Sequence, residues 1–287
     1  GLLRHLPAHA GSVLLVALNA SVAQCGGGGQ ATNVSLVRPE KMNALGAPMF
    51  RDLEAVIATL KQQPGLRAVV LHGQGRGFCG GLDKSRFEVF ADGGEDDLVP
   101  DIDARTHGPS NLAQHLAMGW RELPVPVIAA LHGPVIGGGL QLALGADIRL
   151  ASSDAQFSAL EINWGLVPDM GGHVLLRGLL RDDVARELVY TGRLVAAEEA
   201  VRIGLATRVC TDPLAEAGAL AQAIAQRSPS AIRAAKRLAN LAQRTLDDSA
   251  AALLKAESAE QGELTGRFNQ MEALRANIEK RAPRFED

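Results

Sequence analysis

The sequence is poor in cysteine, has no excess of positive charge and contains no long apolar run. Its 287 residues include three cysteines, Cys25, Cys79 and Cys210, which are too widely spaced for a CxxC pair or a disulfide-rich domain. They suit a reducing compartment and argue against a zinc cluster. With 29 Lys and Arg against 32 Asp and Glu, the formal charge is −3. No net cationic field therefore favours a nucleic-acid partner or an anionic membrane.

No stretch approaches the roughly 18 consecutive apolar residues that a membrane-spanning helix needs. The N-terminus is the one ambiguous place, because Arg4 and His5 precede an apolar run over residues 12–18. A secretory signal ending near Ala23 is the alternative there. The run is short and rich in β-branched valine, so we interpret it as a first strand, followed by a Gly-rich loop over 19–30. We expect a cytoplasmic protein.

The composition is typical of a globular protein with a hydrophobic core. Hydrophobic residues make up 47% and charged residues 21%, which allows a sizeable core and excludes global disorder. The length suits two average domains, or one large α/β domain with an appended piece.

Short β-rich runs alternate with helical patterns in the first half of the chain. The expected strands cover residues 32–37, 67–71, 126–131 and 147–151. Between the first two, apolar residues recur at three- and four-residue steps over 44–62, which predicts an amphipathic helix. Strands that alternate with helices imply parallel crossover units, so the predicted fold class is α/β.

The second half of the chain differs in character. Residues 88–109 are acidic and aperiodic, and we expect a mobile surface loop near a site entrance. After about Asp182 the strands run out. Successive helices are expected at 186–190, 196–203, 214–226, 231–243, 247–264 and 269–280. We divide the chain into an N-terminal strand or extension (1–30), an α/β core (31–205) and a helical C-terminal region (206–287).

Two glycine patterns resemble nucleotide-binding loops but lack their context. Residues 75–80 fit GxGxxG after a strand, yet no helix and no second strand with a terminal acid follow. The glycine run 26–29 lacks a following GK[ST]. Neither pattern predicts a nucleotide site.

A glycine triplet, Gly137 to Gly139, follows an expected strand and opens a helical stretch. Backbone N–H groups at a helix start are unpaired, and glycine lets an anionic oxygen approach them closely. This arrangement suits an oxyanion-binding device. A tight turn beneath a closely packed helix is the alternative interpretation of the same residues.

Two carboxylates, Glu161 and Asp169, flank a loop that contains glycine and proline. If the loop folds back, both face one cavity, and a difference between their pKa values would let one act as a base while the other holds a proton. The alternative is a pair of solvated loop acids.

Taken together, these pieces resemble the crotonase, or enoyl-CoA hydratase/isomerase, superfamily over roughly residues 30–287. The segments that carry the resemblance occur in the family's order and spacing, and they are 38–45, 77–83, 132–139, 147–149, 161–172 and 279–285. The resemblance implies a spiral core of ββα units that holds an acyl-CoA site, and a helical C-terminal trimerisation region. It also implies a homotrimer or a dimer of trimers.

The resemblance further implies an oxyanion hole made by the backbone N–H groups of Leu82 and Gly138. The residues it places along the coenzyme A path or at its phosphates are Lys41, Ala44, Gly80, Asp83 and Lys280. For Lys280, a solvated terminal lysine is the alternative. Enolate chemistry with carboxylates as proton carriers needs no metal and no cofactor, since coenzyme A is part of the substrate.

Gln141 departs from the hydratase pattern, which has a glutamate there. An amide orients water or substrate but exchanges no proton at neutral pH, so efficient hydration is in doubt. Glu161 and Asp169 match the carboxylate pair of the family's dienoyl-CoA isomerases, although that pattern also has an acid at position 141. We therefore expect double-bond isomerisation. The alternatives are a hydratase with Glu161 as main catalyst and a catalytically weak acyl-CoA-binding protein.

Overall fold

Two sheets organise the computed structural model, which describes residues 23–26, 31–86, 99, 101–244, 250–281 and 283. The large sheet has the order β1 (Ala23–Gly26), β2 (Ala31–Leu36), β3 (Ala68–Gly73), β4 (Val127–Leu131), β6 (Ile148–Ala151), β9 (Arg208–Val209). The small sheet has the order β5 (Pro134–Ile136), β7 (Gln156–Ser158), β8 (Val195–Ala196). The large sheet is parallel except for β1, which pairs antiparallel with β2.

From β4 to β7, successive strands alternate between the two sheets. β4 is followed by β5 and then by α4 (Gly138–Gly145), and β6 is followed by β7. β4 pairs with β6 in the large sheet, while β5 pairs with β7 in the small one. The bridge between Cys79 and Val135 extends the small-sheet pattern to the preceding turn of the chain. The β4–β5 and β6–β7 repeats thus each add one strand to each sheet, as in the predicted spiral core of ββα units.

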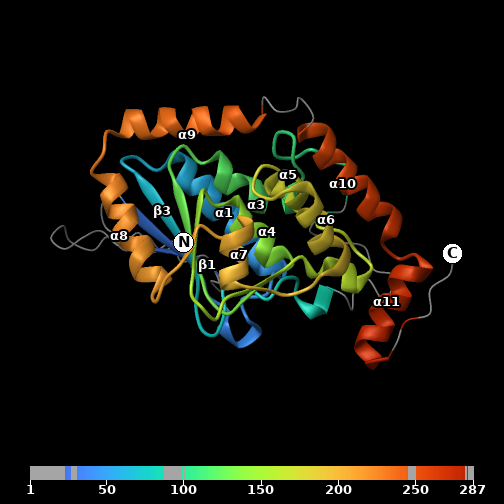
Figure 1. Ribbon diagram of the computed structural model, residues 1–287. Helices are drawn as coiled ribbons and strands as arrows, with labels where there is room; N and C mark the ends of the chain where they lie inside the picture. The colour runs from blue at the N-terminus through green and yellow to red at the C-terminus, as the bar shows by residue number, and fades with distance from the viewer. Residues whose placement is uncertain are drawn as a thin grey trace, which may run out of the picture.

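Helices surround the sheets and continue to the C-terminal end (Figure 1). Besides α4, they are η1 (Pro39–Lys41), α1 (Ala47–Gln62), α3 (Leu112–Glu122), η2 (Leu160–Trp164), α5 (Gly172–Leu176), α6 (Asp182–Thr191), α7 (Ala197–Ile203), α8 (Pro213–Ala225), α9 (Pro229–Arg244), α10 (Ala250–Leu264) and α11 (Phe268–Glu279). In Figure 1, α8 lies at one side of the molecule, while α10 and α11 lie at the other. None of the helices in the described ranges has the length and apolarity to cross a membrane.

The large sheet is covered on both faces. Ala217 and Ala221 of α8 pack against Val70, Ile128 and Leu150 on one face, and their small side chains allow close approach. The main core lies on the other face. Parallel strands buried on both sides are expected to be apolar throughout, which explains why short continuous apolar runs predicted them correctly.

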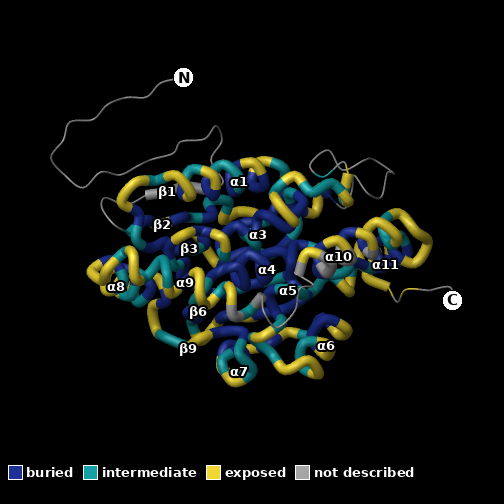
Figure 2. Tube along the Cα trace, turned by 90° about the horizontal axis from the view of Figure 1, so that it is seen from above, coloured by how far each residue is buried: buried dark blue, intermediate teal, exposed yellow. Residues whose placement is uncertain are grey.

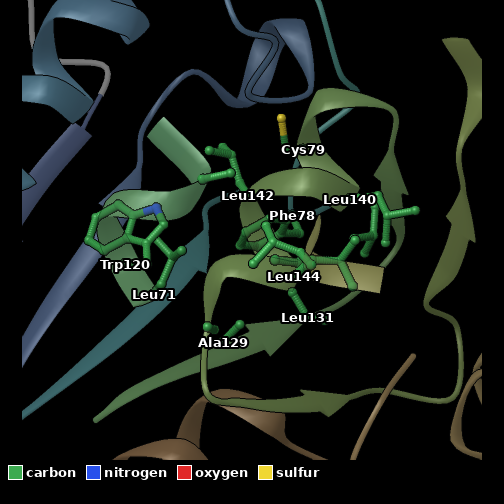
Figure 3. Packing of buried hydrophobic residues seen from close by; sticks show 14 of the residues in the cluster. Leu71, Phe78, Cys79, Trp120, Ala129, Leu131, Leu140, Leu142 and Leu144 are labelled. Carbon is green, nitrogen blue, oxygen red and sulfur yellow. The ribbon is translucent and has the colours of Figure 1, made fainter. Parts of the chain in front are cut away.

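Helix α4 is buried along its whole length (Figure 2). Figure 3 shows Leu140, Leu142 and Leu144 packed with Phe78 and Trp120 in the core. Full burial of a leucine side chain contributes about 1.5–3 kcal/mol. This packing fixes the position of the α4 N-terminus.

Most expected elements are confirmed, within a few residues at their ends. The expected strand over 12–18 and most of the acidic segment 88–109 lie outside the described residues. The loop expected over 19–30 is wrong in part, because Ala23–Gly26 forms β1 on the free edge of β2. Edge pairing uses backbone groups, so it leaves little trace in side-chain pattern.

The expectation that strands end near Asp182 is also wrong. β8 and β9 follow, but strands of two residues are too short to show any periodicity. Helix α3 was not predicted either, although its start carries a capping box in which the side chains of Asn111 and Gln114 each accept the other residue's backbone N–H.

Candidate active site

A cavity of about 490 Å³ lies between the α/β core and the C-terminal helices. Its lining comes from segments far apart in the sequence: the residues around Leu45 and Phe50, the turn after β3, the starts of α3 and α4, η2 with the loop that follows it, and α10. The volume is in the range of small-molecule sites.

The glycine triplet forms the turn that leads into α4. Gly137 has φ +54° and ψ −122°, a conformation that side chains disfavour, and its N–H donates to the Ser158 carbonyl at 2.8 Å. A Cβ atom on Gly139 would lie 2.5 Å from the backbone oxygen of Cys79. The tight turn and the close packing therefore both occur, and they bring the first amide of α4, that of Gly138, to the cavity.

The Leu82 backbone lies beside this helix start. Leu45 donates its N–H to the Gly81 carbonyl at 2.7 Å and accepts from the Asp83 N–H at 3.1 Å, so the bridge leaves the Leu82 N–H unused. A Cβ atom on Gly81 would lie 3.8 Å from the Gly138 nitrogen, which shows how close the two backbones are. Within the described ranges, neither the Leu82 N–H nor the Gly138 N–H has an acceptor. These two donors are available to a ligand oxygen.

Glu161 is the second residue of η2, which ends at Gly165 in the left-handed conformation. Its Oε1 accepts a hydrogen bond from Gln141 Nε2 at 2.7 Å. Its Oε2 is buried and has no hydrogen-bond partner among the described residues. A Cβ atom on Gly137 would lie 3.5 Å from Oε1, so the carboxylate sits against the glycine turn.

The pKa of Glu161 lies near neutral pH. Burial raises the pKa of Glu161 to about 7, the negative charge of Asp169 adds to the rise, and the hydrogen bond from Gln141 opposes it. Asp169 is half-buried and lines the same cavity. The two carboxylates therefore meet at one site, as the sequence predicts, and Glu161 has the pKa expected of a general base at neutral pH.

The loop between η2 and α5 is clamped from two sides. Gln141 Oε1 accepts the backbone N–H groups of Met170 at 2.8 Å and Gly172 at 3.0 Å. From α10, Gln261 Oε1 accepts the N–H of Val167 at 3.2 Å. The loop that carries Asp169 is thus held by α4 and α10 together.

The residues proposed for coenzyme A have different surroundings. Gly80 lines the cavity. Lys41 is exposed at the end of η1, and half-buried Ala44 offers its carbonyl to Arg38 Nη1 at 3.2 Å. Lys280 is exposed at the end of α11, outside the cavity lining.

Asp83 is buried beside this region. The residue is 4% exposed, outside the cavity lining, and its carboxylate bonds Arg38 and Ser85, so its place along the coenzyme A path stays a prediction. Burial opposes its ionisation, yet the bonds from Ser85 and Arg38 lower the pKa of Asp83. These hydrogen bonds connect the segment around Leu82 to Arg38 and Ser85.

Several lining residues were not predicted from the sequence. Lys84 and Arg86 follow the Leu82 segment directly and bring positive charge to the cavity. Gln261 and Gly262 belong to α10 and Thr265 directly follows it, almost a hundred residues away from η2. Their helix packs on the site only in the folded protein, so no local motif signals them. Among the described residues, no three His, Cys, Asp or Glu side chains gather as a metal site requires.

Comparison with known proteins agrees with this geometry. Residues 28–287 match the family model described as enoyl-CoA hydratase/isomerase. A Mycobacterium tuberculosis relative named "Probable enoyl-CoA hydratase EchA12" is 37% identical over 270 residues, which cover 88% of each chain. The short-chain-enoyl-CoA hydratase of Clostridium acetobutylicum is 31% identical, over 88% of this chain and 93% of its own.

A solved structure extends the likeness to three dimensions. The enoyl-CoA hydratase/isomerase of Pseudoalteromonas atlantica superposes with a TM-score of 0.78 at 27% identity, covering 93% of this chain and all of its own. The chain therefore belongs to the enoyl-CoA hydratase/isomerase family, the crotonase superfamily that its motifs indicated.

Proposed function

We propose that the protein moves a carbon–carbon double bond within an acyl-CoA thioester. The observation that carries the proposal is the buried, unpartnered Oε2 of Glu161, which shares a cavity with the free N–H groups of Leu82 and Gly138. A base beside two convergent donors suits proton removal next to a carbonyl whose oxygen becomes negative. Family membership supports a CoA thioester as the substrate.

The carboxylates and the two N–H groups account for the proton that moves and for the charge that develops. Glu161 Oε2 takes a proton from the α carbon of a 3-enoyl-CoA, and the C–H electron pair forms an extended enolate whose charge collects on the thioester oxygen. The N–H groups of Leu82 and Gly138 stabilise that oxygen, and losing one such donor typically costs about 3 kcal/mol. A carboxylic acid, Glu161 or Asp169, then returns a proton to the γ carbon. When Glu161 returns the proton, the enzyme ends in its starting state; when Asp169 returns it, a proton passes from Glu161 to Asp169 to complete the cycle. The chemistry calls on neither a metal nor a cofactor.

Gln141 favours isomerisation over water addition. Addition of water to a 2-enoyl-CoA needs groups that take one proton from water and deliver another to the α carbon. The amide of Gln141 lies against Glu161 and has no proton to exchange at neutral pH. Glu161 and Asp169 suffice for a shuttle of one proton along an acyl chain.

Hydration is the second candidate, because the relatives from Mycobacterium and Clostridium carry hydratase names. Glu161 would then be the main catalyst. We also propose that coenzyme A enters past Gly80, with Lys84 and exposed Lys41 near its phosphates. The cytoplasmic location and the trimer or dimer of trimers stay predictions.

Steady-state assays with 2-enoyl-, 3-enoyl- and 3,5-dienoyl-CoA distinguish the candidates. Isomerisation predicts double-bond migration with slow water addition. Fast hydration without migration contradicts it, and CoA-ester binding without turnover of any of the three indicates a binding protein. With Asp169→Asn, a proton-returning role predicts that kcat falls more than binding weakens, whereas a pure loss of stability indicates a structural role.

A further inference from the structure

Asn43 is a buried polar residue whose side-chain amide is bonded at both ends. The residue is 0% exposed, lies outside the cavity lining and comes just after η1, with a left-handed backbone at φ +54°. Its Oδ1 accepts the backbone N–H of Arg38 at 2.8 Å. Its Nδ2 lies 2.9 to 3.1 Å from three carbonyl oxygens in the turn after β3, those of Gln74, Gly77 and Phe78. Buried hydrogen bonds of this kind fix the backbone that they join.

The backbone beside Asn43 pairs with the segment that carries the Leu82 N–H. Gly80 donates its N–H to the Met42 carbonyl at 2.8 Å. Leu45 bonds the backbone on either side of Leu82, at 2.7 and 3.1 Å. The position of this stretch therefore determines where the Leu82 N–H lies.

Arg38 supports the same segment at Asp83, the residue after Leu82. Its Nη1 bonds the Asp83 carboxylate and donates to the Ala44 carbonyl at 3.2 Å. Its backbone N–H is the donor that Asn43 Oδ1 accepts. Asn43 and Arg38 therefore form one hydrogen-bonded unit around the Leu82 segment.

The contacts of Asn43 also extend toward Gly138. Cys79 directly follows the turn whose carbonyls Asn43 bonds, and its thiol donates to the Asn43 carbonyl at 3.1 Å. Cys79 donates its N–H to the Pro134 carbonyl and accepts the Ile136 N–H, both at 3.0 Å. Gly138 lies two residues after Ile136, at the start of α4. One side chain thus bonds the turn that connects the backbones leading to Leu82 and to Gly138.

Asparagine suits this position for two reasons. It adopts the left-handed conformation more readily than most residues that have a side chain. Its amide also combines an acceptor for Arg38 with two hydrogens for the carbonyls of the turn. Aspartate has the same shape but at most one hydrogen to donate, so it cannot replace both functions.

We infer that Asn43 and Arg38 are positioning residues that set the spacing between the N–H groups of Leu82 and Gly138. The inference rests on the proposed function, because it takes the thioester oxygen as the shared acceptor of these two donors. Donors stabilise a developing negative charge only when both reach it at hydrogen-bond distance, so a displacement of about 0.5 Å weakens the stabilisation.

A purely structural role makes different predictions. If Asn43 only closes the turn after β3, its replacement lowers the free energy of unfolding. In the molecules that remain folded, the bound thioester carbonyl would then be as strongly polarised as in the wild type. The polarisation of that carbonyl is therefore the readout that separates the two roles.

The test compares the wild type with Asn43→Asp and Arg38→Gln. Asn43→Asp keeps the acceptor for Arg38 but leaves at most one hydrogen for three carbonyls. Arg38→Gln changes a half-buried residue, which keeps the inference testable if the buried variant does not fold. The control Asn240→Asp makes the matched change in α9, where the Asn240 amide donates to the Arg121 carbonyl at 3.0 Å, outside the cavity lining.

The probe is butanoyl-CoA labelled with ¹³C at its carbonyl. Its saturated chain has no double bond to move or hydrate, so the measurement does not depend on turnover. Isotope-edited infrared difference spectroscopy measures how far the carbonyl stretch shifts to lower frequency on binding. Assays with a 3-enoyl-CoA give kcat and KM, and melting curves confirm folding.

We expect the wild type to shift the carbonyl stretch to lower frequency. Asn43→Asp should lose about half of this shift or more, because one of two donors no longer reaches the oxygen, and Arg38→Gln should lose a smaller part. The value of kcat for Asn43→Asp should fall by about tenfold or more, with a smaller change in KM. Asn240→Asp should keep the full shift.

Full shifts in the folded variants at positions 38 and 43 overturn the inference. If Asn43→Asp does not fold, a full shift in Arg38→Gln is sufficient to overturn it. An equal loss in Asn240→Asp also contradicts it, because that variant perturbs only α9. A wild type that polarises the carbonyl without moving a double bond contradicts the proposed reaction and leaves the positioning role intact.

Discussion

The two walls of the cavity are built differently. The wall formed by the α4 N-terminus and η2 depends on backbone hydrogen bonds and on glycines that leave no spare room, such as Gly139 against Cys79. The wall formed by α10 and the segment before α3 is joined by side chains. Buried Ser258 Oγ accepts from Asn111 Nδ2 at 3.1 Å, Gln114 Nε2 at 3.2 Å and Arg105 Nη1 at 3.3 Å.

The α10 wall is less tightly packed among the described residues. There, a Cβ atom on Gly262 would meet only the Ile102 side chain, at an ordinary 3.6 Å. Reacting atoms need fixed positions to within about 0.5 Å, whereas the rest of an acyl chain needs only volume. Under the proposed function, we expect the α4 wall to determine the chemistry and the α10 wall to determine which acyl chains fit.

The largest effect is expected from replacing Glu161, the proposed catalytic base on the α4 wall. Glu161→Gln keeps the shape of the side chain and one accepting oxygen but removes the proton acceptor. The value of kcat for isomerisation should fall by about 10²- to 10⁴-fold. Steady-state kinetics measures this, and a melting curve confirms folding. Normal turnover by a folded variant would show that another residue is the base.

A matched pair of glycine substitutions compares the walls directly. Gly139→Ala places a Cβ atom 2.5 Å from a backbone oxygen, and the resulting overpacking should destabilise the protein by about 1–3 kcal/mol. Gly262→Ala has room in α10 and gains helix propensity, so it should stabilise by up to about 1 kcal/mol. Denaturant unfolding of both variants measures the difference. Equal losses would mean that the walls are equally tight.

The pH dependence of stability tests how much the ionisation of buried Glu161 destabilises the folded protein. The pKa of Glu161 in the folded protein, about 7, lies above its ordinary value of 4.5. Its contribution to stability is therefore fully present below pH 4.5 and is lost as the pH rises through 7. Glu161→Gln lacks this loss, so its Tm relative to the wild type should rise between pH 4 and pH 8. A constant difference contradicts the raised pKa.

A smaller and more selective effect is expected from filling the α10 wall. Gly262→Leu would occupy the space next to Ile102. It should raise KM for long acyl chains by about tenfold, since each excluded methylene is worth about 0.8 kcal/mol. The kinetics of the shortest substrates should stay close to those of the wild type. A uniform loss for all chain lengths would place Gly262 away from the acyl chain.

The contrast between the walls also separates what the sequence predicts from what it does not. Glu161 and Gly138 sit in local motifs whose backbone geometry follows from glycine and helix-start rules, so their places were predictable. The contact of Asp83 with Arg38 was not predictable, because it joins residues 45 positions apart and adjacency to Leu82 says nothing about it. Gln261 and Gly262 reach the cavity only through tertiary packing of α10.

Proton exchange at the substrate's α carbon tests the role of Glu161 most directly. A 3-enoyl-CoA is incubated with enzyme in D₂O, and ¹H NMR follows the loss of the α protons and the appearance of deuterated 2-enoyl product. We predict rapid exchange with the wild type and about 10²- to 10⁴-fold slower exchange with Glu161→Gln. Equal exchange rates for the two proteins would contradict proton removal by Glu161 beside the Leu82 and Gly138 amides.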